Sequence, residues 1–227
     1  MKYWLVMPAA GVGRRFGTER PKQYAALSGR TVIEWALAPF LTDPRCAGVV
    51  VALAEEDPYW GAIAPATVIR APGGRERSHS VRNGLATLAE RARPDDWVLV
   101  HDAARPCLTR QDLDRLLFEL GAHPVGGLLA TPAADTLKRA DARGEVVQTI
   151  DRAGLWRALT PQMFRYGRLC EALDRAHAAG RMPTDEAQAI EWLGDLPRLI
   201  EGAPANLKIT RAADLAIAAA LLAETCS

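Results

Sequence analysis

The sequence of 227 residues has few of the features that mark membrane, secreted or zinc-binding proteins. Its apolar runs, such as 48–54 and 215–223, are far shorter than the roughly 18–20 residues of a membrane-spanning helix. Its four cysteines are scattered without a C-x-x-C pair, so neither a disulfide framework nor a zinc site is indicated. The first predicted strand begins so early that no signal peptide is expected. These absences favour a cytoplasmic enzyme.

The charge of the chain is balanced, and the sequence lacks two common phosphate-binding motifs. The formal net charge of +1 argues against a general binder of nucleic acids or membrane surfaces. No Walker A run G-x-x-x-x-G-K-[ST] occurs. The glycines at 11, 13 and 17 are spaced one residue too long for the dinucleotide motif G-x-G-x-x-G, and no acidic residue follows at 37–38 to hold a ribose.

What the sequence does have is a basic, glycine-rich segment at 8–22, directly after the predicted strand at 4–7. Small residues let a backbone approach a ligand closely, and main-chain N–H groups together with cations bind anions. The segment therefore predicts a polyphosphate site, and an ordinary turn with solvated cations is the alternative. Its cations are Arg14, Arg15, Arg20 and Lys22.

Strand and helix patterns alternate along the chain, which predicts an α/β fold. We expect a Rossmann-like, mostly parallel sheet flanked by helices. Strands are expected at 49–53, 67–70, 97–101, 127–131, 196–201 and 207–210. Helices are expected at 32–41, 80–91, 110–120, 168–179, 185–193 and 212–224, the last apolar all round and therefore packed in the core.

The segment 135–152 breaks this alternation and predicts a β-hairpin. Its runs 136–140 and 146–150 flank a turn signal at 141–144. Because an isolated hairpin is marginal in water, it must lie against its own domain or another copy of the chain. We favour the second copy.

Further candidate residues follow predicted strands, where open α/β sheets bind ligands. Asp102 could hold Mg²⁺ or substrate hydroxyls with Arg105 beside it, or it could merely cap a turn and pair with that arginine. We expect His101 to be a satisfied interior histidine. The segment 73–80 suits a nucleobase site, although Ser78 or Ser80 could simply cap a helix.

Seven runs of the sequence occur in the order and spacing of one known family: PAAGVGRRFGTERPKQY, GGRERSHSVRNGL, VLVHDAARP, DTLKRA, TIDRAGLWRALTPQ, TDEA and NLKIT. Together they resemble the 2-C-methyl-D-erythritol 4-phosphate cytidylyltransferase family of non-mevalonate isoprenoid synthesis. The resemblance spans residues 8–210 and implies a glycosyltransferase-A-like nucleotidyltransferase fold. It also implies CTP with Mg²⁺, and a homodimer joined by the hairpin arm. We expect one domain over 1–227, with the arm inserted at about 133–157.

The resemblance also implies a role for each matched residue. The catalytic residues would be Arg15, Lys22 and Lys208. The nucleotide would contact Ala9, Ala10, Gly11, Gly13, Gly74, Ser80 and Asp102. The polyol phosphate would contact Asp102, Arg105, Thr160 and, from the arm of the neighbouring subunit, Thr136 and Arg152. Mg²⁺ would bind Asp102 directly or through water.

The implied reaction is attack of the substrate phosphate on the α-phosphorus of CTP, in line with the leaving pyrophosphate. A phosphate dianion needs no general base, which agrees with a site rich in Arg and Lys. Two alternatives stay open: a cytidylyltransferase for another polyol phosphate, such as ribitol 5-phosphate, and a non-catalytic nucleotide sensor.

Overall fold

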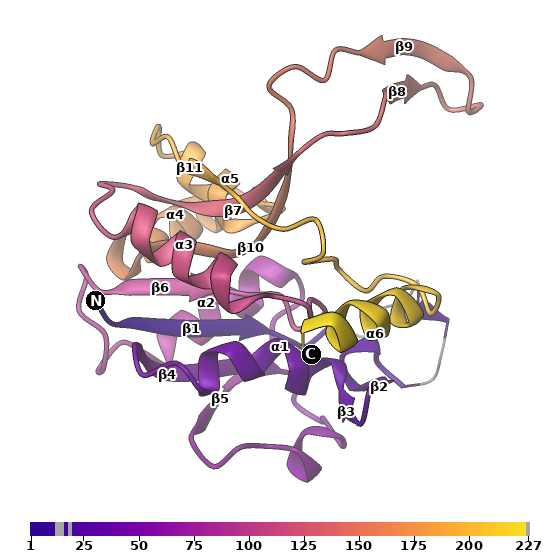
Figure 1. The fold of residues 1–227 in the computed structure, drawn as a ribbon. Helices are drawn as coiled ribbons and strands as arrows, with labels where there is room; N and C mark the ends of the chain where they lie inside the picture. Colours follow the sequence, from indigo (N-terminus) through magenta and orange to yellow (C-terminus); the bar gives the residue numbers. More distant parts are fainter. Residues whose placement is uncertain (12–15, 18–19, 226–227) are drawn as a thin grey trace.

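A seven-stranded sheet forms the centre of the protein, in the order β11-β7-β10-β6-β1-β4-β5 (Figure 1). The structure is a computed structural model that describes residues 1–11, 16–17 and 20–225. All neighbouring pairs are parallel except those of β10, which runs against β6 and β7. The prediction of a mostly parallel sheet is confirmed, although the antiparallel strand at 156–165 was not predicted. The strands are β1 (Tyr3–Pro8), β4 (Cys46–Leu53), β5 (Val68–Pro72), β6 (Trp97–Val100), β7 (Gly126–Pro132), β10 (Trp156–Arg165) and β11 (Arg198–Glu201).

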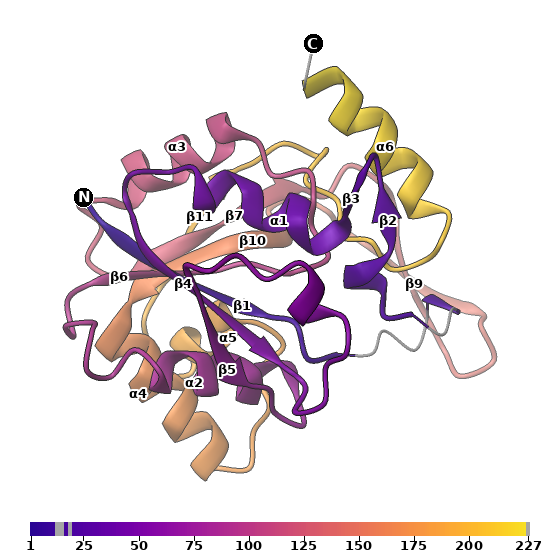
Figure 2. The same ribbon diagram turned by 90° about the horizontal axis from the view of Figure 1, so that it is seen from below.

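Helices cover both faces of this sheet (Figure 2). On one face lie α1 (Val32–Leu41) and α3 (Arg110–Leu120); on the other lie α2 (Arg77–Ala86), α4 (Tyr166–Ala178) and α5 (Glu186–Glu191). Side chains alternate across a strand, so β1 sends Leu5 and Met7 into one core and Val6 into the other. Burial on both faces explains why these strands are apolar almost throughout.

The predicted hairpin is present as an arm that projects from the sheet between β7 and β10 (Figure 1). It consists of β8 (Leu137–Ala140) paired antiparallel with β9 (Val146–Ile150). Its turn is closed by Asp141, whose Oδ1 accepts from the backbone N–H groups of Arg143 and Glu145. Val146 and Val147 are 62% and 58% exposed, so this chain alone leaves apolar arm surface in solvent.

Two sequence-based predictions at the C-terminal end are wrong. Residues 207–210 form no strand; the backbone N–H of Ile209 donates to Ala104 O in a loop. The helix α6 (Asp214–Thr225) is buried on one side only, since Ala218 and Leu222 are buried whereas Ile217 is 56% exposed. It packs beside the short hairpin of β2 (Ala26–Leu27) and β3 (Arg30–Thr31) rather than on the main sheet. Only one side of the helix is therefore buried, and the other side faces solvent.

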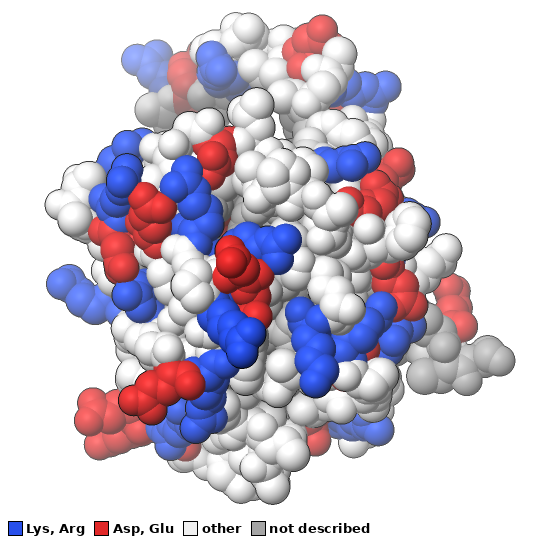
Figure 3. Space-filling view, turned by 90° about the vertical axis from the view of Figure 1, so that its left-hand side faces the viewer, with Lys and Arg blue, Asp and Glu red and all other residues white. Residues whose placement is uncertain are grey.

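Charges on the surface are mixed. Figure 3 shows Lys and Arg interspersed with Asp and Glu on one face of the molecule. This pattern agrees with the net charge of +1. Across residues 1–11, 16–17 and 20–225, no helix has the length and apolarity that a membrane span requires.

Candidate active site

The carboxyl ends of β1, β4, β5 and β6 meet at one edge of the sheet and open into a pocket of about 540 Å³. Segments far apart in the sequence line it, from the loops after β1, β5 and β6 and, through Lys208, from the loop after β11. The predicted site residues in its wall are Ala9, Ala10, Gly11, Lys22, Gly74, Ser80, Asp102 and Lys208. The predicted Gly13 and Arg15 lie outside the described residues. The topology thus brings together most of the residues predicted for the nucleotide.

Gly73 lets the loops after β1 and β5 touch, and Gly74 lets the second of these loops turn closely against the start of α2. A Cβ on Gly73 would lie 2.3 Å from the Ala10 Cβ, and one on Gly74 would lie 2.3 Å from the His79 Cβ. The loop after β1 is fixed from its other side by Gln23, whose Nε2 donates to Ala9 O at 2.8 Å and to Gly11 O at 3.1 Å. The backbone at these positions is therefore held close to the space that a nucleotide would fill.

The segment 73–80 is a turn that leads into α2. Ser80 Oγ accepts from Gly74 N at 3.0 Å and lies 3.3 Å from Glu76 O, so its hydroxyl fastens this turn. The helix begins at Arg77, three residues before the predicted start, and its N-cap is Glu76. The alternative that Ser78 or Ser80 caps the helix is wrong, since both lie within its first turn.

Lys22 reaches the same pocket from a short 3₁₀ turn at Lys22–Tyr24. Its Nζ donates to Ile209 O at 2.9 Å, which ties this turn to the loop that carries Lys208. Two of the three predicted catalytic cations are thereby placed in one wall of the pocket.

Asp102 is the electrostatic centre of the site. It is buried, and three cations converge on its carboxylate: Arg77 Nε at 2.9 Å from Oδ1, Lys208 Nζ at 2.8 Å from Oδ2, and Arg105 Nε at 3.6 Å from Oδ2. Burial opposes the charge, but these cations hold the pKa of Asp102 well below its ordinary value. The group is therefore an anion at neutral pH. The predicted pairing of Asp102 with Arg105 is present, within a larger cluster.

Thr160 hydrogen-bonds to the backbone of Asp102 and also contacts His101. Thr160 Oγ1 accepts from the backbone N–H of Asp102 at 3.1 Å and lies 2.9 Å from His101 Nδ1. His101 Nε2 lies 3.1 Å from Arg105 O, so an imidazole protonated at Nε2 satisfies both contacts. Burial lowers the pKa of His101 to about 4. The prediction of a satisfied interior histidine is confirmed.

A second pocket of about 640 Å³ adjoins the first and shares Lys208 with it. Arg105 and Arg157 give it a basic wall. Arg105 Nη1 donates to Asn206 O at 2.6 Å, and burial lowers its pKa. Its cations suit the phosphate of a second substrate.

The two arm residues predicted to contact substrate lie elsewhere. Thr136 and Arg152 are exposed on the arm and are not among the described residues that line either pocket. Arg152 donates to Ala134 O within the arm. Within one chain, therefore, the arm does not complete the site.

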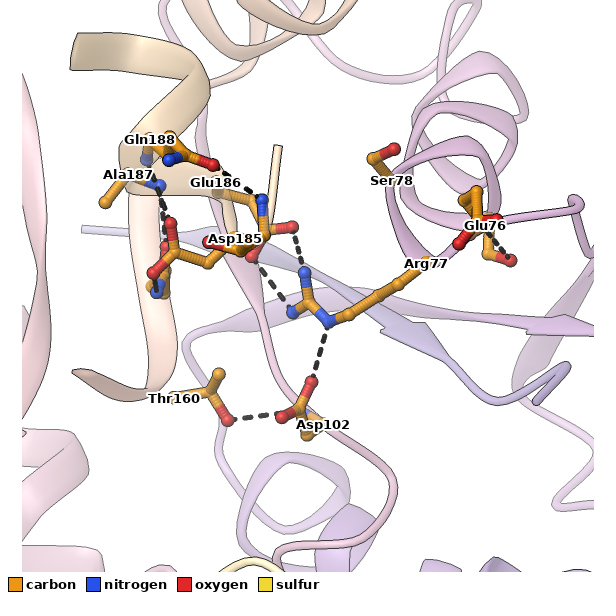
Figure 4. A network of polar contacts seen from close by, with 12 residues as sticks. Glu76, Arg77, Ser78, Asp102, Thr160, Asp185, Glu186, Ala187 and Gln188 are labelled. Carbon is orange, nitrogen blue, oxygen red and sulfur yellow. Dashed lines mark hydrogen bonds and ion pairs between the residues drawn. The ribbon is translucent and has the colours of Figure 1, made fainter. Parts of the chain in front are cut away.

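Sequence reasoning missed Arg77 and Glu186. Arg77 lines the pocket and bridges Asp102 to Glu186, a buried residue 109 positions away (Figure 4). The run TDEA, which contains Glu186, stood among the matching motifs, but nothing in it indicated a partner for its carboxylate.

The donor set does not fit a metal bound directly by Asp102. Its Oδ1 and Oδ2 each already contact a cation, Arg77 and Lys208, and a directly bound ion would meet both positive charges. Within the described part of the chain, no three His, Cys, Asp or Glu side chains are grouped as metal ligands. Of the two predicted arrangements, contact through water is the one that this geometry accommodates.

Comparison with known proteins identifies the family. The model of the 2-C-methyl-D-erythritol 4-phosphate cytidylyltransferase family matches residues 3–224. The chain belongs to this family. It is thus an enzyme, a nucleotidyltransferase, as the resemblance implied.

Individual relatives agree. Proteins of that name from Ectopseudomonas mendocina and Pseudomonas aeruginosa are each 59% identical to this chain, covering 95% and 94% of it and 93% of each relative. Among solved structures, a 4-diphosphocytidyl-2C-methyl-D-erythritol synthase is 42% identical with a TM-score of 0.85, over 97% of this chain and 98% of that one. The Francisella tularensis cytidylyltransferase is 33% identical with a TM-score of 0.84, over 97% and 100%. The family's fold therefore extends over nearly the whole chain.

Proposed function

We propose that this chain transfers the cytidylyl group of CTP to 2-C-methyl-D-erythritol 4-phosphate and releases pyrophosphate. The observation that carries this assignment is the family match across residues 3–224. The pocket agrees with it, because backbone and small side chains line one part and cations the other. The product would be 4-diphosphocytidyl-2-C-methyl-D-erythritol.

The chemistry rests on charge and position. The substrate phosphate attacks the α-phosphorus of CTP, the new P–O bond forms as the bond to pyrophosphate breaks, and no proton has to be removed from the dianion. His101 is neutral, buried and engaged at both nitrogens, so it has no role as a base. Lys22 and Lys208 would stabilise the charge that builds up on the phosphates, with Arg15 as the third catalytic cation.

The second substrate would lie beside Lys208, in the basic pocket. Arg105 lines this basic pocket and Asp102 lines the first one. Thr160, predicted to contact the polyol phosphate, is not among the described residues that line either pocket and instead accepts from the backbone N–H of Asp102. Ala9, Ala10, Gly11, Gly13, Gly74 and Ser80 would face the nucleotide. This arrangement would bring the two reacting phosphates next to each other, beside one cluster of cations.

The arm would act in a homodimer. Its exposed valines favour burial against a second copy of the chain, and its sheet of two strands has little stability alone. Thr136 and Arg152 would then reach the polyol phosphate in the partner's site. The chain would act as one cytoplasmic catalytic domain over 1–227, with residues from about 133 to 157 as its arm.

Mg²⁺ would bind to the phosphate oxygens of CTP and would neutralise part of their negative charge. Mg²⁺ usually keeps several waters and binds through few protein carboxylates. Contact with Asp102 through water is compatible with the lysine and arginine that already occupy that carboxylate.

Pyrophosphate release tests the assignment. The purified protein would receive CTP and Mg²⁺ with methylerythritol 4-phosphate, ribitol 5-phosphate or erythritol 4-phosphate, and ATP, GTP and UTP would replace CTP in parallel. We expect strong preference for CTP with the methylated substrate. Release with ribitol phosphate alone would move the enzyme to another pathway. No release from a folded protein that binds CTP would favour a nucleotide sensor.

A further inference from the structure

Glu186 is a buried carboxylate to which the proposed reaction gives no task. It is the first residue of α5, its exposed fraction is 0%, and its oxygens accept from Arg77 Nη1 at 2.6 Å and Nη2 at 3.1 Å. The third nitrogen of that guanidinium, Nε, donates to Asp102 Oδ1 at 2.9 Å. One arginine thus joins a carboxylate in the interior to the carboxylate in the pocket wall (Figure 4).

This geometry restricts the orientation of Asp102. A guanidinium is a rigid planar fork, so a two-point contact with Glu186 also fixes the direction in which Nε donates. Oδ1 of Asp102 is held by that donor, which leaves Oδ2 facing Lys208 Nζ at 2.8 Å. The position of the ammonium therefore depends on Glu186 through two intervening residues.

Glu186 itself is carried by a well-anchored turn. The backbone N–H of Ala187 donates to Gln162 Oε1 at 2.8 Å, and Gln162 Nε2 donates to Asp185 Oδ2 at 2.9 Å. Asp185 also caps α5 through Gln188 N at 2.9 Å. These hydrogen bonds attach the run TDEA to Gln162 of β10, two residues after Thr160.

Charge balance gives the contact a second consequence. Arg77, Arg105 and Lys208 face two carboxylates in this cluster, Asp102 and Glu186. Without the charge of Glu186, three cations would compete for one anion and for the phosphates of CTP. Burial raises the pKa of Glu186 and Arg77 opposes that rise.

We propose that Glu186 is a positioning residue for cytidylyl transfer, which acts through Arg77 to fix Asp102 and hence Lys208 at the reacting phosphates. The inference rests on the proposed function. It assigns Glu186 to the turnover step and not to nucleotide affinity, because loss of its charge makes the pocket more cationic.

The test combines Glu186→Gln, Arg77→Gln and the double variant, with Glu191→Gln as a control on the exposed side of the same helix. For Glu186→Gln we expect a roughly 10- to 100-fold lower kcat, the scale of a small misplacement at a reacting centre. The Kd of CTP should stay equal or become lower. The double variant should be no slower than Arg77→Gln, because Glu186 acts through that arginine.

Several results would overturn the proposal: kcat of Glu186→Gln within twofold of the wild type, a loss of CTP affinity that matches the loss of kcat, or losses that multiply in the double variant. The double variant removes both charges of the pair and keeps the test available if Glu186→Gln does not fold. Wild-type protein that releases no pyrophosphate from CTP and methylerythritol 4-phosphate would instead refute the proposed function itself.

Discussion

Replacing Asp102 by Asn should destabilise the fold and abolish most turnover. The change leaves Arg77, Arg105 and Lys208 without the carboxylate on which they converge. Loss of one partner of a buried ion pair typically costs about 3–5 kcal/mol, and the lower end applies because the amide oxygen still accepts. In a chain of this length, 1 kcal/mol corresponds to roughly 2–4 °C in Tm, so we expect a decrease of about 6–12 °C.

Differential scanning calorimetry with and without inorganic phosphate would measure this effect. The uncompensated cations form an anion site, so phosphate should raise the Tm of Asp102→Asn more than that of the wild type. Asp95→Asn is the matched control, since Asp95 is exposed. A variant that keeps the wild-type Tm, or that gains nothing extra from phosphate, would refute the electrostatic role.

The pH dependence of stability tests independently whether ionised Asp102 stabilises the fold. The folded-state pKa of Asp102 lies below its ordinary value, so its ionisation stabilises the fold above the unfolded-state pKa of about 3.9. That stabilisation decreases as the pH falls below this value. The difference in unfolding free energy between wild type and Asp102→Asn should therefore be full at neutral pH and narrow on acidification below about pH 4. A difference that is constant over this range contradicts the argument.

Three further predictions concern the pocket and the arm. Lys22→Ala should lower kcat by at least about 10²-fold in a steady-state assay, the scale for one preorganised electrostatic group. Arg152→Ala should raise KM for the polyol phosphate and leave the Kd of CTP unchanged, as measured by calorimetry. Gly73→Ala should weaken CTP binding and lower Tm, because the new Cβ would lie 2.3 Å from the Ala10 Cβ.

Each has a contradicting outcome, and two have a matched control. Near-normal turnover of Lys22→Ala would remove the catalytic role. Arg139→Ala, on the exposed arm, should leave both substrates unaffected, and equal weakening of both by Arg152→Ala would argue against a substrate contact. Gly61→Ala should be neutral, since a Cβ there meets nothing within 4 Å; unchanged CTP binding by Gly73→Ala would mean that the loops separate at little cost.

The sequence predicted six of the seven strands of the main sheet, because most of these strands contain runs of buried apolar residues. The β6 strand at Trp97–Val100 is such a case. The sequence missed β10, whose run WRALTPQMFR mixes polar and apolar residues. Local signals failed where a tertiary contact decided. Leu207 and Ile209 alternate like strand residues, yet they belong to a small cluster with α6 and not to a sheet. The start of α2 was placed three residues late because its N-cap, Glu76, makes no side-chain cap hydrogen bond.

The residues that line the pocket were largely predictable from the sequence, but the contacts that hold them in place were not. Motif runs located the residues that line the pocket, because each follows a strand whose carboxyl end meets that edge. The pairing of Arg77 with Glu186 spans 109 positions, and the contact of Lys22 with the Ile209 carbonyl spans 187. Neither residue type indicates its partner, so only the fold reveals them.

These long-range contacts explain how a site without a general base can be effective. Catalysis by positioned charge requires cations that stay in place when anionic substrates arrive, and a lysine on a flexible stem does not do so unaided. Here Lys208 is held by Asp102, that carboxylate by Arg77, and the arginine by a carboxylate with no exposed surface. This series of contacts connects the lysine in the pocket wall to the buried interior of the protein. Substitution of Glu186, which does not line the pocket, should therefore affect turnover more than nucleotide binding, and the effects of two substitutions within the chain of contacts should not multiply.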